Sequence, residues 1–200
     1  MPDYCSLAEV RAMEEMDDAT AVPDATITEA IAYAEELIDR FTGTSWIYKT
    51  FSVTLSGSND SAIRLKDDEG RAILYPRTIS SCTVDGTSQT TAGWALYPEG
   101  VVVRDTGYFT NTFPGRNVVV VGTAGLTTAA PEDIAWCART IARQYILDLI
   151  SRLPDRATGV NTSDGTIMLA QASAHPDRPT SLPDVNARLV RRRQRGPSIA

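Results

Sequence analysis

The chain has 200 residues, of which 42% are hydrophobic and 22% charged, and its formal net charge is −6. This composition is typical of one soluble globular domain or two small ones, and it excludes wholesale disorder, collagen-like repeats and a coiled coil. The longest strongly apolar run, residues 118–121, is too short to cross a bilayer, and the first residues lack a signal-peptide pattern. We therefore expect a cytoplasmic origin and no membrane partner.

Charge is distributed unevenly along the chain. Residues 1–50 carry 3 basic and 11 acidic side chains, residues 51–150 carry 8 and 10, and residues 151–200 carry 8 and 4. An acidic body with a basic tail differs from a duplex-DNA reader, which needs a positive face to displace counterions. A block of charge at a terminus is more typical of an interaction tail.

Two helices are predicted near the start of the chain, over about residues 6–16 and 25–42. Ser6 and Glu9 have the spacing of a capping box, in which each side chain binds the backbone amide of the other residue. In the second helix, apolar residues three and four positions apart form one stripe: Ile27, Ile31, Ala34, Ile38 and Phe41. Gly43 stands where a left-handed C-terminal cap favours glycine.

The hydrophobic pattern changes to a period of two over residues 46–122. The candidate strands are short and are separated by turn residues: 51–55, 62–65, 72–74, 81–84, 94–97, 101–103 and 118–121. Several short strands at this spacing predict a compact antiparallel sheet or sandwich. The region carries no catalytic signature.

A third, long helix is predicted over residues 131–153, and it begins at Pro131, a residue that suits the first helical position. Its apolar side chains cover more than one face, so more than one face must be buried. The local pattern favours a central core helix. The alternative is that part of it packs against a neighbouring subunit through Trp136, Ile146, Leu147 and Ile150.

Residues 154–200 are predicted to form an extended C-terminal arm, rich in small and polar residues, with a short helix at about 183–193. Leu182, Val185 and Leu189 give this helix an apolar edge, and it is basic toward its end through Arg188, Arg191, Arg192, Arg193 and Arg195. Two interpretations remain open: a solvated terminus, or a docking element for an acidic or grooved partner. The predicted fold class is α+β, with a helical core in residues 1–153, a strand-rich insertion and this arm.

The sequence contains few residues or motifs that indicate catalysis or cofactor binding. It contains no nucleophile elbow, no phosphate-binding glycine-rich loop and no dinucleotide-binding glycine motif. The only histidine, His175, lies in the arm, and it forms no chelate spacing with Cys5, Cys82 or Cys137. We therefore expect no enzyme activity, no cofactor and no metal.

Four segments resemble a known family, the head-to-tail adaptor (head-tail connector) proteins of long-tailed bacteriophages. Residues 4–11 (YCSLAEVR) resemble its opening, residues 30–43 (AIAYAEELIDRFTG) its second helix, and residues 131–135 (PEDIA) the start of its long helix. Residues 182–189 (LPDVNARL) resemble the C-terminal segment of adaptors from phages of actinobacteria. The four segments occur in the family's order and span most of the chain.

The resemblance implies a viral structural protein, made in the host cytoplasm and located in the virion at the portal vertex. Such adaptors form a homo-oligomeric ring, commonly a dodecamer, beneath the portal protein. The ring extends the DNA channel, so genomic DNA passes through without specific binding, and it presents a surface to the next stopper, head-completion or tail protein.

In relatives the C-terminal segment docks into the portal. This implies portal docking here by Leu182, Val185 and Leu189 with the arginines Arg188, Arg191, Arg192 and Arg193. The insertion at 46–122 departs from short family members, which have only a small hairpin at that place. The alternative functions are another head-completion protein, such as a stopper or tail terminator, and, less favoured, a small soluble enzyme.

Overall fold

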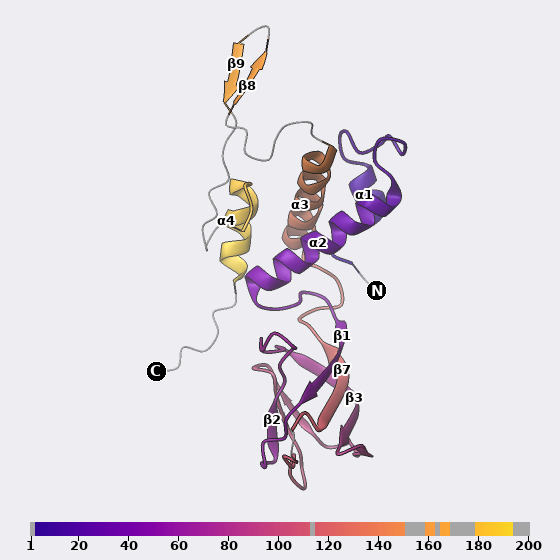
Figure 1. Ribbon diagram of the computed structural model, residues 1–200, viewed down its shortest axis with the longest axis vertical. Helices are drawn as coiled ribbons and strands as arrows, with labels where there is room; N and C mark the ends of the chain where they lie inside the picture. Colours follow the sequence, from indigo (N-terminus) through magenta and orange to yellow (C-terminus); the bar gives the residue numbers. More distant parts are fainter. Residues whose placement is uncertain (1–2, 113–114, 151–158, 163–164, 169–178, 194–200) are drawn as a thin grey trace. The chain divides into compact units, whose positions relative to one another are not determined.

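The computed structural model describes residues 3–112, 115–150 and 179–193, and the backbone of residues 159–162 and 165–168 (Figure 1). Contacts divide the chain into two compact units. One unit is Gly43–Ala129, and the other combines Asp3–Thr42 with Ala130–Ala200. We call them the β unit and the helical unit. The fold class is α+β, as predicted.

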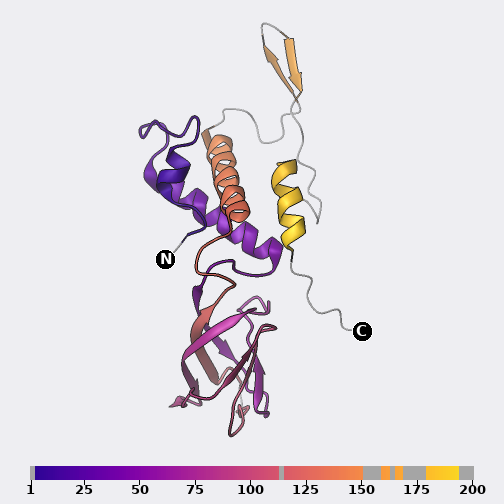
Figure 2. The same ribbon diagram turned by 180° about the vertical axis from the view of Figure 1, so that it is seen from behind.

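The described residues of the helical unit form four helices: α1 (Leu7–Arg11), α2 (Asp24–Thr42), α3 (Glu132–Ile150) and α4 (Pro183–Arg192). α2 buries the stripe expected from its sequence, and its side chains Ile27, Ala30, Ala34 and Ile38 have no exposed surface. This face packs against α3, which buries Ile134, Cys137, Ala138, Ala142 and Ile146 completely. Seen from both sides, α3 lies between α1 and α4, which do not contact each other (Figures 1 and 2).

α1 is shorter than expected because the chain turns back on itself after Arg11. The predicted capping box is present, with the Glu9 amide bound to Ser6 Oγ and the Ser6 amide bound to Glu9 Oε2. The Arg11 guanidinium then donates to the carbonyls of Met16 and Val22, each at 2.8 Å. These bonds hold residues 12–23 as a compact loop, so the prediction of helix up to residue 16 was wrong.

The β unit contains two antiparallel sheets. The first has the strand order β1-β7-β3-β4, and its strands are β1 (Lys49–Leu55), β7 (Val118–Ala124), β3 (Pro76–Val84) and β4 (Thr87–Ser88). The second has the order β2-β6-β5, with β2 (Ala62–Arg64), β6 (Val101–Val103) and β5 (Ala95–Tyr97). The antiparallel arrangement predicted from the sequence is confirmed.

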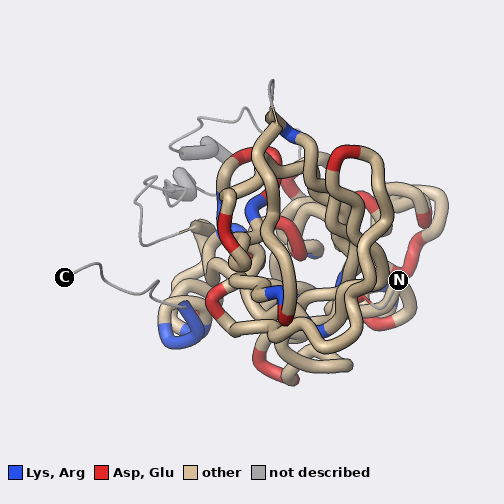
Figure 3. The backbone as a smooth tube through the Cα atoms, turned by 90° about the horizontal axis from the view of Figure 1, so that it is seen from below, with Lys and Arg blue, Asp and Glu red and all other residues tan. Residues whose placement is uncertain are grey.

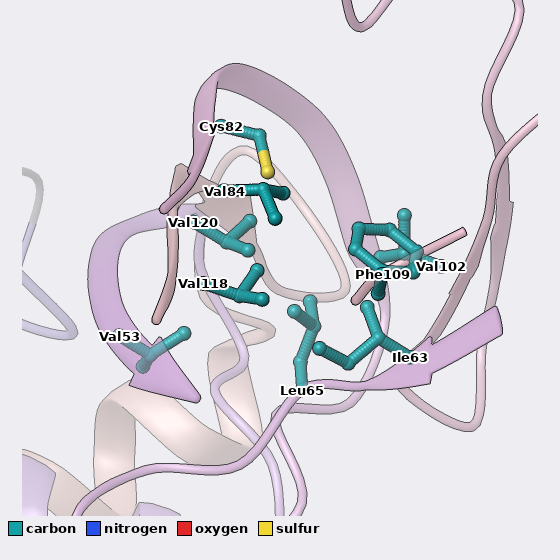
Figure 4. Close-up of a cluster of buried hydrophobic side chains, with 9 residues drawn as sticks. All are labelled: Val53, Ile63, Leu65, Cys82, Val84, Val102, Phe109, Val118 and Val120. Carbon is teal, nitrogen blue, oxygen red and sulfur yellow. The ribbon is translucent and has the colours of Figure 1, made fainter. Parts of the chain in front are cut away.

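The core of the β unit is filled from both sheets (Figure 4). The buried cluster consists of side chains that alternate along the strands and of two residues in loops: Val53, Ile63, Leu65, Cys82, Val84, Val102, Phe109, Val118 and Val120. Alternation places every second β7 side chain inside, which explains why four consecutive valines belong to a strand with only one face in the core.

Two expectations for strands differ from the structure. Residues 72–74 do not form a strand, because Tyr75 takes a positive φ of 54° and only an isolated bridge, Lys66 to Ala72, forms there. The arm contains an unexpected hairpin of β8 (Gly159–Thr162) and β9 (Gly165–Met168). The short helix at the end is confirmed as α4, and contacts group it with the other helices.

Candidate functional site

The surface around α4 brings together most of the residues that the sequence analysis singled out. α4 begins with Pro183 at its first turn, and it packs against α2 and α3. Its apolar edge faces these helices, so Val185 and Leu189 have no exposed surface. Leu182, just before the helix, is half-buried. The apolar spacing that predicted this edge is thus used inside the chain.

A group of hydrogen bonds between Asn186 and Thr180 fixes the segment that precedes α4. The Asn186 side chain donates to the Thr180 carbonyl at 2.8 Å, and its oxygen accepts from the Thr180 hydroxyl at 2.8 Å and the Thr180 amide at 3.1 Å. Asn186 is only 7% exposed, so satisfying its amide matters for packing. The sequence analysis did not find this residue, because a single asparagine in a helix has no distinctive spacing.

The arginines of α4 are held individually. The Arg188 guanidinium lies 4.1 Å from the centroid of the Trp136 ring, and the Arg193 guanidinium 5.2 Å from that of Phe41. Arg192 forms a bidentate ion pair with Asp133 at 2.8 and 3.1 Å. Cations over aromatic faces and bidentate carboxylate pairs both suit the planar guanidinium.

Arg191 differs from these three, since it is exposed and makes no ion pair or ring contact with any residue that the structure describes. An open groove of about 740 Å³ runs beside it, lined by residues of α3 and α4: Asp133, Trp136, Asp184, Ala187, Arg188, Arg191 and Arg192. The run of arginines is visible as a basic stretch at the end of the described helix (Figure 3). The groove is therefore polar, and its lining contains three arginines and two aspartates.

The predicted docking residues differ in whether a partner can reach them. Val185 and Leu189 are covered by the chain's own helices, and so they offer nothing to a partner in this structure. Arg188, Arg191, Arg192 and Arg193 are exposed on the outer side. The predicted docking set is thus divided into an inner apolar anchor and an outer basic surface.

The residues predicted for a subunit interface are also divided. Ile146 has no exposed surface, so it belongs to the core of the helical unit. Trp136 and Leu147 are half-buried, and Trp136 is covered in part by Arg188. Ile150, which is 47% exposed, is the member of the set with the most free surface.

A second apolar surface, of which the sequence analysis singled out only Ile150, lies at the opposite end of α3. Tyr145 stacks on Tyr33 of α2 with ring centroids 4.7 Å apart, and its hydroxyl donates to Glu29 at 3.1 Å, a bond that raises the pKa of Tyr145. Leu149, one turn after Tyr145, is 56% exposed, and Tyr33 is 45% exposed. We call the surface formed by Tyr145, Leu149 and Ile150 of α3, together with the adjacent Tyr33 of α2, the apolar end of α3.

The three cysteines lie in buried surroundings. Burial raises the pKa of the Cys5 thiol to about 12 and that of Cys137 to about 11, and it also raises the pKa of Cys82. All three thiols are therefore protonated at neutral pH. Within the described ranges, no group of histidine, cysteine and carboxylate side chains could hold a metal ion. His175 lies outside the described residues.

One polar feature of the β unit was also missed. The Arg104 guanidinium lies over the rings of Trp94 and Phe109, and it donates to Gln89 Oε1 and the Tyr108 carbonyl. Its Nε is buried without an acceptor among the described residues. Arg104 also lines a cavity of about 300 Å³.

No helix in the described part of the chain combines the length and apolarity needed to cross a membrane. No protein-family model matches the sequence, and no curated protein matches it either.

Solved structures do share the fold. A chain from the virion of a native gene transfer agent particle has a TM-score of 0.59 and 20% identity, covering 96% of this chain and 89% of that chain. A chain from the neck of the native particle, computed with C12 symmetry, has a TM-score of 0.54 and 21% identity over 95% and 88%. A chain from the neck of the empty particle, computed with C6 symmetry, has a TM-score of 0.54 and 19% identity over 74% and 88%. At these identities the likeness concerns the fold.

Proposed function

We propose that this protein is a structural subunit of the neck of a phage-like particle: a head-to-tail adaptor that forms a ring beneath the portal. The observation that carries the proposal is the fold shared with chains of gene transfer agent necks over up to 95% of this chain. A likeness that includes both units is more specific than one limited to a helix pair. The adaptor-like segments near residues 4–11, 30–43 and 131–135 agree with it.

The same comparison supports a ring. The two neck structures were computed with C6 and C12 symmetry. A ring of twelve copies, which is compatible with both, is what we propose here. Each subunit in a ring must present two different surfaces to its two neighbours. The apolar end of α3 is suited to be one of them, because exposed aromatic and aliphatic side chains gain most from burial.

The outer arginines of α4 are suited to the portal contact. Three of the four are held by a ring or a carboxylate, so they lose little side-chain freedom when a partner binds. A preorganised basic surface favours an acidic partner surface. In this proposal Val185 and Leu189 anchor α4, and Arg188 and Arg191 contact the portal.

The genome is proposed to pass through the ring without specific contacts. With a formal charge of −6 per subunit, a ring of twelve is strongly acidic overall, and such a wall discourages DNA from adhering. The charge comes from the helical unit, because the 7 basic and 7 acidic side chains of residues 43–129 balance.

The test is assembly with the portal protein of the particle to which this chain belongs. We expect the purified mixture to give one complex whose native mass corresponds to a portal plus twelve subunits, and we expect cryo-imaging of particles to place the protein at the vertex through which DNA leaves. Failure to bind the portal, with binding instead to a tail protein, would reassign the chain as a stopper or tail terminator. Particles with the protein distributed over the shell would contradict every neck assignment.

A further inference from the structure

The connection between α3 and α4 is far longer than their packing requires. α3 has 19 residues, so it is about 28 Å long, and the chain must return along it to place α4. Residues 151–182 form this connection, 32 positions that would span about 100 Å when extended. Adjacent packed helices are ordinarily joined by about 2 to 8 residues.

The site that receives α4 is complete without it. Its contacts come from α2 and α3, through Phe41, Asp133 and Trp136. We call these three residues the α4 seat. The β8–β9 hairpin inside the connection packs against no other element of the described chain.

α4 is also easily exchanged. Its anchor consists of two fully buried apolar side chains, Val185 and Leu189, and its polar contacts are at the solvent-exposed rim. Exchange between copies preserves each of these contacts, because donor and acceptor have the same sequence.

From these three features we propose that, in the assembled ring, α4 of each subunit occupies the seat on α2 and α3 of its neighbour. This inference rests on the proposed ring. In a closed ring every subunit both gives its α4 to one neighbour and receives α4 from the other, so every α4 seat is filled. An open chain of exchanged subunits would leave one α4 seat empty. In an isolated subunit the tethered seat has the higher effective concentration, and α4 folds back on its own chain. The exchange would link adjacent subunits by their backbones, in addition to surface contacts.

Two single-cysteine variants provide the test, because the side chains of Asp133 and Arg192 meet. Asp133→Cys and Arg192→Cys are mixed in equal amounts as free subunits, assembled into rings with the portal, and treated with a short bismaleimide. The ion pair of Asp133 and Arg192 is partly exposed to solvent, where such pairs contribute little, so both variants should fold. The native cysteines are buried, and each variant alone serves as the control for their reactivity.

We expect a linked two-chain product in the mixture and none in either variant alone. By random mixing, about one quarter of the donor–acceptor contacts carry both new cysteines. The double variant D133C/R192C should give a ladder of linked chains in the ring, but only an internal link, found by peptide mass, in the free subunit.

The outcomes separate the two claims. Rings in which the mixture gives no two-chain product, while the double variant is linked internally, would overturn the exchange and leave the ring intact. Absence of any ring would overturn the proposed function and the exchange with it.

Discussion

Ile146 and Ile150 are one turn apart on α3, yet Ile146 has no exposed surface and Ile150 is 47% exposed. The helix therefore leaves the core of its unit between these two positions. This boundary separates the two interpretations that the sequence left open for α3, the core helix and the subunit contact. The core interpretation holds for Ile146, whereas Ile150 is on the surface and its contact with a neighbouring subunit stays a prediction.

The first prediction uses this pair. Ile146→Asp places a charge in the core and should lower the free energy of unfolding by several kcal/mol, enough to unfold most of the protein. Ile150→Asp should leave the urea midpoint nearly unchanged and weaken self-association, as measured by sedimentation. Equal loss of stability in both variants would show that Ile150 is not a surface residue.

A second prediction concerns the cation–π contact of α4. Arg188→Ala removes a guanidinium that lies 4.1 Å from the Trp136 ring centroid, at a cost of about 0.5–1 kcal/mol for an exposed site. Hydrogen exchange of the α4 amides should become faster. Arg191→Ala is the matched control, since it removes the same side chain from the same helix where no described partner is lost, and it should leave exchange unchanged.

A third prediction tests whether the apolar edge of α4 belongs to the subunit. Leu189→Ala should cost about 2–5 kcal/mol of α4 docking, because Leu189 is completely buried. Val190→Ala, at the next and 48% exposed position, should cost well under 1 kcal/mol. The measurement is urea unfolding of the subunit without any portal. If the two variants were indistinguishable, the edge would be free in solution and available for docking, as the sequence first predicted.

The fourth prediction is a pH dependence at the start of the chain. Hydrogen bonds from the Ser6 amide and hydroxyl, together with the nearby Arg139, lower the pKa of Glu9. A depressed carboxyl pKa stabilises the folded state above the ordinary value of about 4.3, and that contribution is lost as the pH falls through the lowered value. The α1 contact with α3 should therefore weaken only in acid.

NMR titration of Glu9 measures this directly. Ser6→Ala should raise the pKa of Glu9 only in part, because the backbone amide of residue 6, its strongest hydrogen-bond donor, remains. Glu9→Gln should remove the acid dependence of the α1 amide signals. A titration of Glu9 at its ordinary pKa in the wild-type protein would contradict the capping geometry.

The sequence predicted best where a local pattern has one physical solution. The capping box of Ser6 and Glu9 and the left-handed Gly43, with φ of 78°, are confirmed because each depends on residues within a few positions. The loop after α1 was not predictable, because Arg11 binds the carbonyl of Val22, a long-range contact without a pattern. The buried edge of α4 shows the same limit: spacing revealed that Val185 and Leu189 share a face, but not which surface covers it.

The fifth prediction is that the β unit folds by itself. Its two ends run side by side, since the Tyr48 amide donates to the Thr127 carbonyl at 3.1 Å and the Thr127 amide to the Trp46 carbonyl at 3.1 Å. The cluster of nine buried residues lies wholly within Gly43–Ala129. A fragment of these residues should therefore unfold in one cooperative transition and keep strand signals in circular dichroism.

Val102→Asp, at a fully buried position, should abolish that transition, whereas Tyr97→Asp, at a 48% exposed position, should not. A fragment that unfolds gradually would show that the strands depend on the helical unit, and the insertion would then be part of one cooperative body.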